Sequence, residues 1–240
     1  MRISEIWRYP IKSVGGESLE SADLDEFGIP GDRGWGIVDT ETGTVLTGRR
    51  EPKLLLATCR MVDGHPVTTT VEGSVLHTSA EYSEWLGKPV ELAAAGDSGG
   101  TYENPMDPFG ETDWISWTGP SGAWHDSGRT RVSLVSRASL GDWDHRRFRT
   151  NVILDGGGED ELVEQSVALG SCVLDITKQI DRCVMVTRPQ PGLDRDLDVL
   201  KTIIRERNNR LAIGGLVAET GTIAIGDELT VAGKDGTRPA

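Results

Sequence analysis

One of the three cysteines, Cys183, directly follows an arginine in the stretch DRCVMVTRP and has the residue type best suited to chemistry. A cationic neighbour such as Arg182 favours the thiolate form of a thiol, and the thiolate is the form that binds soft metals. The alternative is that Cys183 is a small, inert core residue. The composition of VMVT predicts a strand, in which Arg182 and Cys183 would point to opposite faces.

Basic side chains recur at predicted turns and strand starts, in the stretches YPIKSVGG, PGDRGW, TGRREPKL and RFRTN. Loops of this kind gather side-chain and backbone donors around oxyanions, and arginine suits the bidentate binding of phosphate or carboxylate. Each charge, taken alone, is better interpreted as a solvated surface group. Taken together, the stretches predict an anion-binding pocket. Its candidate residues are Lys12, Ser13, Arg33, Arg49 and Arg149.

The charge and motif content exclude several classes of partner. A formal net charge of −13 argues against nucleic acid or an anionic membrane surface as partner. Neither G-x-x-x-x-G-K-[ST] nor G-x-G-x-x-G occurs, so nucleotide folds are not supported, and a pyridoxal phosphate-like phosphate pocket is not expected. An anionic ligand therefore needs a local cationic pocket that opposes the overall charge of the protein.

The chain is expected to be cytoplasmic. No apolar run approaches the roughly 20 residues that a membrane helix needs. The N-terminal stretch MRISEIWRYPIKS also lacks the apolar segment of a signal peptide.

The remaining cysteines and the histidines show no metal-binding motif. The three cysteines are odd in number and widely spaced, which argues against a disulfide framework, and no C-x-x-C occurs. Cys172 alternates with Leu174 and Ile176, which predicts a core face, and Cys59 is interpreted in the same way. The four histidines lack i, i+4 pairing and are expected at surface or turn positions.

A mainly β fold with a few peripheral helices must position these residues. Many short alternating stretches predict an N-terminal β-barrel unit over 1–95 and a C-terminal one over 131–235, followed by a disordered tail at 236–240. Residues 96–130 are rich in Gly, Pro, Asp and Trp without a period, which predicts an irregular functional loop. Its tryptophans either line the mouth of a pocket or pin the loop to the body. They are Trp114, Trp117 and Trp124.

Two helices stand out in the pattern. Thr78 and Glu81 have the spacing of a capping box, and Gly87 is expected to end that helix. A second helix is predicted in LDRDLDVLKTIIRERNN, where apolar residues recur at helical spacing. These residues are Leu193, Leu197, Leu200 and Ile204.

In their order along the chain, a set of motifs resembles the landmarks of the MOSC family, the domains similar to the C-terminal part of molybdenum cofactor sulfurase. The motifs are YPIKS, GDRGW, TGRREPKL, VSRASL, FRTNVIL, RCVMVT and AETGTIAIGDEL. The N-terminal β-barrel domain of that family is also recognisable, so the resemblance spans about 1–230. It implies two β-barrel units, a molybdenum cofactor (Mo-molybdopterin), and the reduction of N-hydroxylated compounds known from the amidoxime-reducing members of the family.

The resemblance also implies catalytic roles. Cys183 would be the protein thiolate on molybdenum, completing the sulfur set begun by the pterin dithiolene. Asp126, in the stretch HDSG, lies near the position where relatives carry an acidic residue beside the metal, and it is a candidate proton donor together with water.

Contacts with the cofactor are implied at the basic stretches. Lys12, Ser13 and Arg33 match positions that bind its phosphate and pterin. Arg149 and Asn151 match the family's FRPN-type contacts, although Thr150 replaces the proline. Further candidates are Arg49 and Arg182.

The resemblance further implies the partners. No four-cysteine iron–sulfur pattern follows Cys183, so the electron donor would be a separate protein of ferredoxin, flavin or haem type. The substrate would be a small N-hydroxylated compound. Two alternatives stay open: a carrier of the molybdenum cofactor or of sulfur without reductase turnover, and a β-barrel scaffold that binds another anion.

Overall fold

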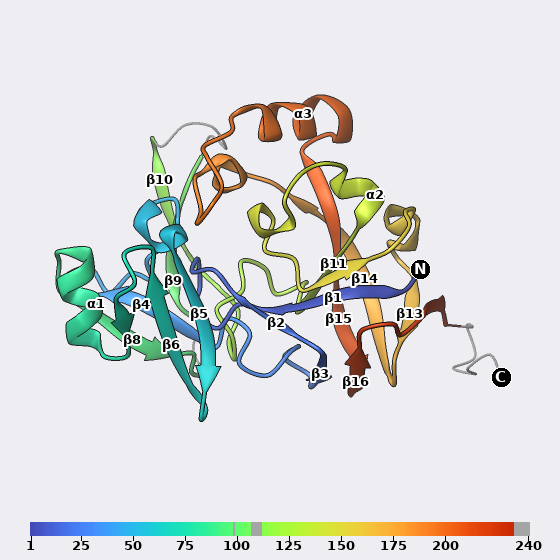
Figure 1. Ribbon diagram of the computed structural model, residues 1–240, viewed down its shortest axis with the longest axis horizontal. Helices are drawn as coiled ribbons and strands as arrows, with labels where there is room; N and C mark the ends of the chain where they lie inside the picture. The colour runs from blue at the N-terminus through green and yellow to red at the C-terminus, as the bar shows by residue number, and fades with distance from the viewer. Residues whose placement is uncertain (98, 107–111, 233–240) are drawn as a thin grey trace.

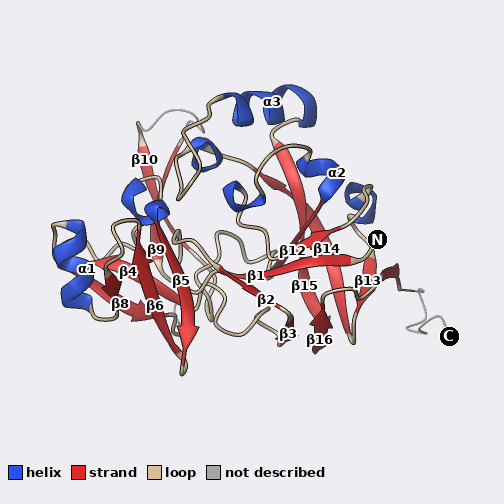
Figure 2. Cartoon of the chain, viewed as in Figure 1, coloured by secondary structure: helices blue, strands red, loops and turns tan. Residues whose placement is uncertain are grey.

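The computed structural model describes residues 1–97, 99–106 and 112–232 (Figure 1). Strands predominate in these ranges, and the short helices lie at the periphery, so the predicted mainly β fold is confirmed (Figure 2). None of the helices in these ranges is long and apolar enough to cross a membrane. The tail predicted at 236–240 lies outside the described residues.

The largest sheet has eight strands in the order β17-β13-β14-β15-β11-β12-β1-β2. These are β1 (Ile3–Arg8), β2 (Glu17–Leu19), β11 (Val132–Ser136), β12 (Val152–Leu154), β13 (Ser166–Leu169), β14 (Cys172–Asp181), β15 (Arg210–Glu219) and β17 (Leu229–Val231). Neighbouring strands are antiparallel except β11 and β12, which are parallel. Leu134 and Val135 point to opposite faces of β11 and are both fully buried, so the middle of this sheet is covered on both sides.

A second group of strands surrounds its own apolar core. It comprises the pair β4 (Trp35–Asp39) and β8 (Val90–Ala94), and the three strands β5 (Ala57–Val62), β6 (His65–Thr70) and β7 (Val75–Leu76). Ile37, Leu54 and Tyr82 are fully buried between them. The predicted burial of both structural cysteines is confirmed, because Cys59 lies in this core and Cys172 lies in the core of the large sheet.

The two halves of the chain share strands. β1 and β2 belong to the large sheet, and β3 (Ser21–Leu24) pairs with β16 (Gly221–Ala224) near the C-terminus. The strands within the first 24 residues are therefore built into the C-terminal half, whereas Ile11 and Val14, between β1 and β2, lie in the core of the second group. The domain boundaries expected from the sequence stay a prediction.

Helix α1 (Ser79–Leu86) is formed as its sequence predicts. Thr78 and Glu81 make the reciprocal capping-box hydrogen bonds, and Gly87 ends the helix in the left-handed conformation at φ 73°. The other helical segments are α2 (Arg137–Leu140), α3 (Asp198–Arg207) and the 3-10 turns η1 (Pro52–Leu56), η2 (His145–Arg147), η3 (Glu159–Leu162) and η4 (Val184–Thr187).

The prediction of an irregular segment over 96–130 is wrong in part, because β9 (Thr101–Pro105) and β10 (Trp114–Thr118) form an antiparallel hairpin. Tyr102 and Trp117 are register partners in this hairpin, and their rings lie 5.1 Å apart. This cross-strand aromatic pair stabilises the hairpin. The segment's high content of turn residues hides the alternation.

Two boundaries near Cys183 differ from the sequence prediction. The stretch 184–187 is the turn η4 and not a strand. Thr187 Oγ1 donates to the Val184 carbonyl at 2.8 Å within the turn, and Val186 packs with Val199 and Leu200 of α3, which holds the turn in place. Helix α3 begins only at Asp198, and Leu197 is 47 % exposed. The preceding segment is held against η4 instead, by a 2.9 Å hydrogen bond from the Asp196 N–H to the Thr187 carbonyl.

Candidate functional site

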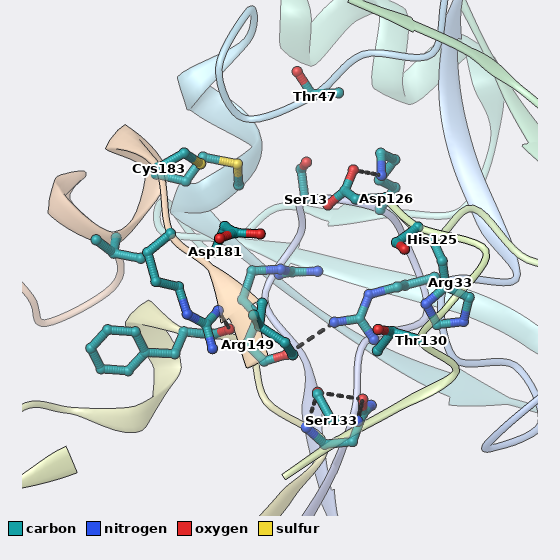
Figure 3. A pocket seen from close by; sticks show the side chains of 18 of the residues that line it. Ser13, Arg33, Thr47, His125, Asp126, Thr130, Ser133, Arg149, Asp181 and Cys183 are labelled. Atoms are coloured by element: carbon teal, nitrogen blue, oxygen red, sulfur yellow. Dashed lines mark hydrogen bonds and ion pairs between the residues drawn. The ribbon is translucent and has the colours of Figure 1, made fainter. Parts of the chain in front are cut away.

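A cavity of ≈ 340 Å³ brings together residues from both halves of the chain (Figure 3). All nine site residues predicted from the sequence line it. They are Lys12, Ser13, Arg33, Arg49, Asp126, Arg149, Asn151, Arg182 and Cys183. Of the described residues that line the cavity, eight are basic and two are acidic, Asp126 and Asp181. The local excess of positive charge expected for an anion pocket is therefore present in a chain whose net charge is −13.

Three lining residues have a backbone conformation that non-glycine residues rarely adopt. Ser13, Arg33 and Arg149 have φ angles of 66°, 52° and 53°. Tertiary contacts hold this backbone: the Arg33 N–H donates to the Tyr9 carbonyl at 2.7 Å, and Arg33 Nη2 donates to the Arg149 carbonyl at 2.9 Å. Such conformations concentrate where structure serves a site, because they persist only where the surroundings enforce them.

The buried ring of Tyr9 lies against both of these arginines. The Arg33 and Arg149 guanidinium carbons are 5.3 Å and 4.5 Å from its centroid. Asp32 forms an ion pair with Arg33, so that charge is compensated inside the protein. Arg149 has no such carboxylate: it donates to the Val14 carbonyl, and its buried Nη2 has no hydrogen-bond partner in the described structure. Burial lowers the pKa of Arg149 to about 10.

Arg182 presents a second unsatisfied donor. Its Nε donates to the Leu211 carbonyl at 2.8 Å and its Nη1 to the Phe148 carbonyl at 3.0 Å, whereas its buried Nη2 has no partner among the described atoms. Burial lowers the pKa of Arg182 to about 10. A buried N–H without an acceptor is costly, so Arg149 and Arg182 each favour a bound acceptor group.

The cation in contact with the Cys183 sulfur is Arg49. Its Nε donates to Sγ at 3.4 Å, and its Nη1 donates to Asn104 Oδ1 in strand β9. Arg182 is the sequence neighbour that was predicted to favour the thiolate, but its observed hydrogen bonds are donated to backbone carbonyls. Cys183 itself is the residue before η4 and is half-buried, so its sulfur is accessible to a ligand in the cavity.

Lys12 and Asp126 form an ion pair inside the cavity. Lys12 Nζ lies 2.7 Å from Asp126 Oδ1 and 2.9 Å from the Trp124 carbonyl. Desolvation by the surrounding protein acts to raise the pKa of the Asp126 carboxyl. The positive charges of Lys12, Arg49 and Arg33 outweigh this effect and lower the pKa to about 2. Asp126 is therefore ionised at neutral pH, which argues against its predicted role as a proton donor.

Asn151 is engaged by the fold. Its Oδ1 accepts from Ser133 Oγ at 2.8 Å and from the Ser133 N–H at 3.2 Å, and its Nδ2 donates to the Trp7 carbonyl at 3.2 Å. These bonds tie β1, β11 and the start of β12 together beneath the cavity. Asn151 therefore links these strands where it lines the cavity, and a contact with a cofactor stays a prediction.

Several polar residues of the cavity lining were missed by the sequence analysis, among them His125 and Thr47. His125 is buried, so its expected surface or turn position is wrong, and its Nε2 has no hydrogen-bond partner in the described ranges. Burial lowers the pKa of His125 well below its ordinary value, and nearby Arg33 and Arg131 add to this. Thr47 Oγ1 is buried in the cavity wall and is also unpartnered there. The sequence held one indication that His125 belongs to the site, because it directly precedes the candidate residue Asp126 in the stretch HDSG.

The tryptophans of the 96–130 segment pin it to the body. Trp117 and Trp124 pack around the buried Tyr102 ring in a cluster that includes Val38 and Val45 of the body, and Trp114 lies under the Arg50 guanidinium at 3.8 Å. None of these three side chains lines the cavity. The alternative that they form its mouth is therefore wrong.

Within the ranges that the structure describes, no three His, Cys, Asp or Glu side chains are grouped to hold a metal ion. Cys183 could thus supply one protein ligand, and the rest of a coordination sphere would have to arrive with a bound group. The chemistry of the cavity is that of an anion pocket with one thiol, Cys183, among the described lining residues.

Two family models match the chain: the MOSC N-terminal beta barrel domain over residues 1–102 and the MOSC domain over residues 123–230. The molybdenum cofactor sulfurase of Drosophila grimshawi is 26 % identical over 93 % of this chain and 34 % of that protein. The mitochondrial amidoxime reducing component 2 of Bos taurus is 40 % identical over 25 % of this chain and 19 % of that protein. The chain thus covers about a third or less of these relatives. The crystal structure of the YuaD protein from Bacillus subtilis aligns with 95 % of this chain and 93 % of that one, at a TM-score of 0.49 and 13 % identity.

Proposed function

The chain belongs to the MOSC-domain family, and from that premise we propose that it is a molybdenum-cofactor-dependent reductase of small N-hydroxylated compounds. Its electrons would come from a separate donor protein. The observation that supports this most is a cavity that combines the accessible sulfur of Cys183 with the unpartnered buried donors of Arg149 and Arg182.

The lining residues fit the chemistry of the cofactor. The buried Nη2 groups of Arg149 and Arg182 have no hydrogen-bond acceptor in the described structure, and the phosphate of a pyranopterin would supply anionic oxygens as acceptors. The pterin ring would offer further acceptors to the other donors of the cavity. Cys183 would add a soft thiolate ligand to the sulfurs that the pterin brings to molybdenum. The cavity volume of ≈ 340 Å³ lies within the range of small-ligand sites.

The protein's contribution to turnover is binding, orientation and charge. When bound, the cofactor would supply a two-electron redox centre and a Lewis acid. The net reaction consumes two electrons and two protons: the N–O bond of R–NHOH breaks, R–NH2 forms, and the oxygen leaves as water. Asp126, being ionised, would hold the Lys12 ammonium in place, which leaves water in the cavity as the proton source.

A second candidate function is a carrier that binds the molybdenum cofactor, or sulfur, without reductase turnover. One observation favours it: the match to a molybdenum cofactor sulfurase spans 93 % of this chain, whereas the match to the amidoxime reducing component spans 25 %. The same cavity would serve both functions, and reductase turnover separates them.

The test is to purify the protein from a host that makes molybdenum cofactor, measure molybdenum and pterin, and assay hydroxylamine reduction with reduced viologen as electron donor. The reductase predicts about one molybdenum per chain and turnover that Cys183→Ser abolishes. Molybdenum without turnover would support the carrier. Protein free of molybdenum, or full turnover by a loaded Cys183→Ser variant, would refute the proposal.

A further inference from the structure

Arg49 connects the β9–β10 hairpin to the sulfur of Cys183. Its guanidinium donates through Nε to Sγ at 3.4 Å and through Nη1 to Asn104 Oδ1. Because a guanidinium group is planar and rigid, an acceptor at Nη1 fixes the direction in which Nε–H points. The side chain of Asn104 thereby determines how Arg49 meets the sulfur.

The loop that carries Arg49 is itself held close to η4. Residues 47–51 form a turn in which the Glu51 N–H donates to the Thr47 carbonyl at 2.8 Å. A Cβ added at Gly48 would lie 2.8 Å from Met185 Cε and 3.2 Å from Leu55 Cγ. The loop therefore packs tightly against the residues that follow Cys183.

The next residue, Arg50, contacts the opposite face of the same hairpin. Its Nε donates to Glu103 at 2.8 Å, and its guanidinium lies over Trp114. Side chains alternate along β9, so Glu103 and Asn104 point to opposite faces. Two consecutive arginines thus contact opposite faces of the hairpin, and of these two residues only Arg49 lines the cavity.

We propose that Asn104 is a positioning residue for the sulfur ligand: by orienting Arg49 toward Cys183, the β9–β10 hairpin sets the redox potential of a metal bound there. This inference rests on the proposed function. A hydrogen bond to a coordinating thiolate reduces its electron donation and stabilises the reduced metal. Loss of the bond is therefore expected to lower the midpoint potential.

The experiment compares molybdenum-loaded wild type with Asn104→Leu, Asn104→Asp, Arg49→Lys and the matched control Arg50→Gln. Molybdenum content, the midpoint potential from an EPR-monitored redox titration, and the sulfur-to-molybdenum absorption band are measured for each. Asn104→Leu and Arg49→Lys should keep their molybdenum and show a lower potential and a shifted band. Asn104→Asp should retain the contact between Arg49 and the sulfur and so the wild-type band, because a carboxylate accepts from the same guanidinium, and Arg50→Gln should match wild type in both properties.

A wild-type potential in loaded Asn104→Leu, or an equal shift in Arg50→Gln, would overturn the inference and leave the proposed function standing. Wild-type protein that takes up no molybdenum would refute the proposed function instead. In that case crystal structures of cofactor-free wild type and Asn104→Leu decide the positioning role. Arg49 Nε should leave the sulfur in the variant, and a retained contact would contradict the role of Asn104.

Discussion

Lys12 Nζ lies 2.7 Å from Asp126 Oδ1, although the lysine side chain is 6 % exposed and the aspartate side chain 80 % exposed. The pair joins the loop after β1 to the HDSG stretch that follows the β9–β10 hairpin. It thereby connects two parts of the cavity wall that are 114 positions apart in the sequence. A buried ammonium without a partner carries a desolvation cost that an exposed carboxylate does not. Removing Asp126 therefore leaves Lys12 as a buried charge without its counter-ion.

Asp126→Asn is expected to destabilise the protein by about 1 kcal/mol at pH 7, discounted for the exposure of the carboxylate. The fold lowers the pKa of Asp126 to about 2, against about 3.9 for an unfolded aspartate. The stabilisation is therefore present above about pH 4 and lost as the pH falls through about 2. Urea unfolding at pH 7 and in acid measures both effects.

The control for this variant is Asp181→Asn. Asp181 also lines the cavity, and it forms ion pairs with Lys178 at 3.1 Å and with Arg210 at 3.5 Å. Both of these basic side chains are solvent-accessible, unlike Lys12. Its replacement should change stability by less than about 0.5 kcal/mol. Equal losses in the two variants would contradict the special role of the Lys12 pair.

His125 should make stability depend on pH near neutrality. Burial holds the pKa of His125 well below its ordinary value, so the folded state keeps it neutral while the unfolded state takes up a proton below about pH 6.5. Stability is then lost as the pH falls below that value, by up to about 1.4 kcal/mol per pH unit. Urea unfolding between pH 5 and 7.5 should show a shallower slope for His125→Gln than for wild type. Identical slopes would place the protonation elsewhere.

The cationic cavity should bind a simple anion even without cofactor. Phosphate at tenfold its dissociation constant would stabilise the fold by about 1.4 kcal/mol, because Arg149 and Arg182 hold buried donors in need of an acceptor. Thermal unfolding in phosphate and in sodium chloride of equal ionic strength measures this. Arg149→Gln should remove the phosphate-specific part, whereas Arg205→Gln, an exposed change on α3, should keep it. Equal stabilisation of both variants would place the anion outside the cavity.

Local signals in the sequence predicted local structure well. The capping box at Thr78 and the end of α1 at Gly87 are formed as predicted, because every contact involved lies within a few residues. Motif order predicted the site for a different reason: each basic stretch occupies a turn, and the fold brings these turns to one cavity.

Features that depend on distant partners could not be predicted in this way. The cation at Cys183 is Arg49, which is 134 positions away, and the adjacent Arg182 donates to other groups. Likewise η4 carries strand-like residues, but its chain is held by packing against α3 and by the segment before that helix. Alternation and composition carry no information about such contacts.

The central claim is that Cys183 is the protein ligand of a molybdenum centre, and X-ray absorption at the molybdenum edge tests it most directly. Wild type, Cys183→Ser and the core control Cys172→Ala are compared after loading. The account predicts that Cys183→Ser has one sulfur fewer around molybdenum while Cys172→Ala keeps the wild-type sulfur shell, since Cys172 is fully buried away from the cavity. An unchanged sulfur shell in Cys183→Ser would contradict the claim.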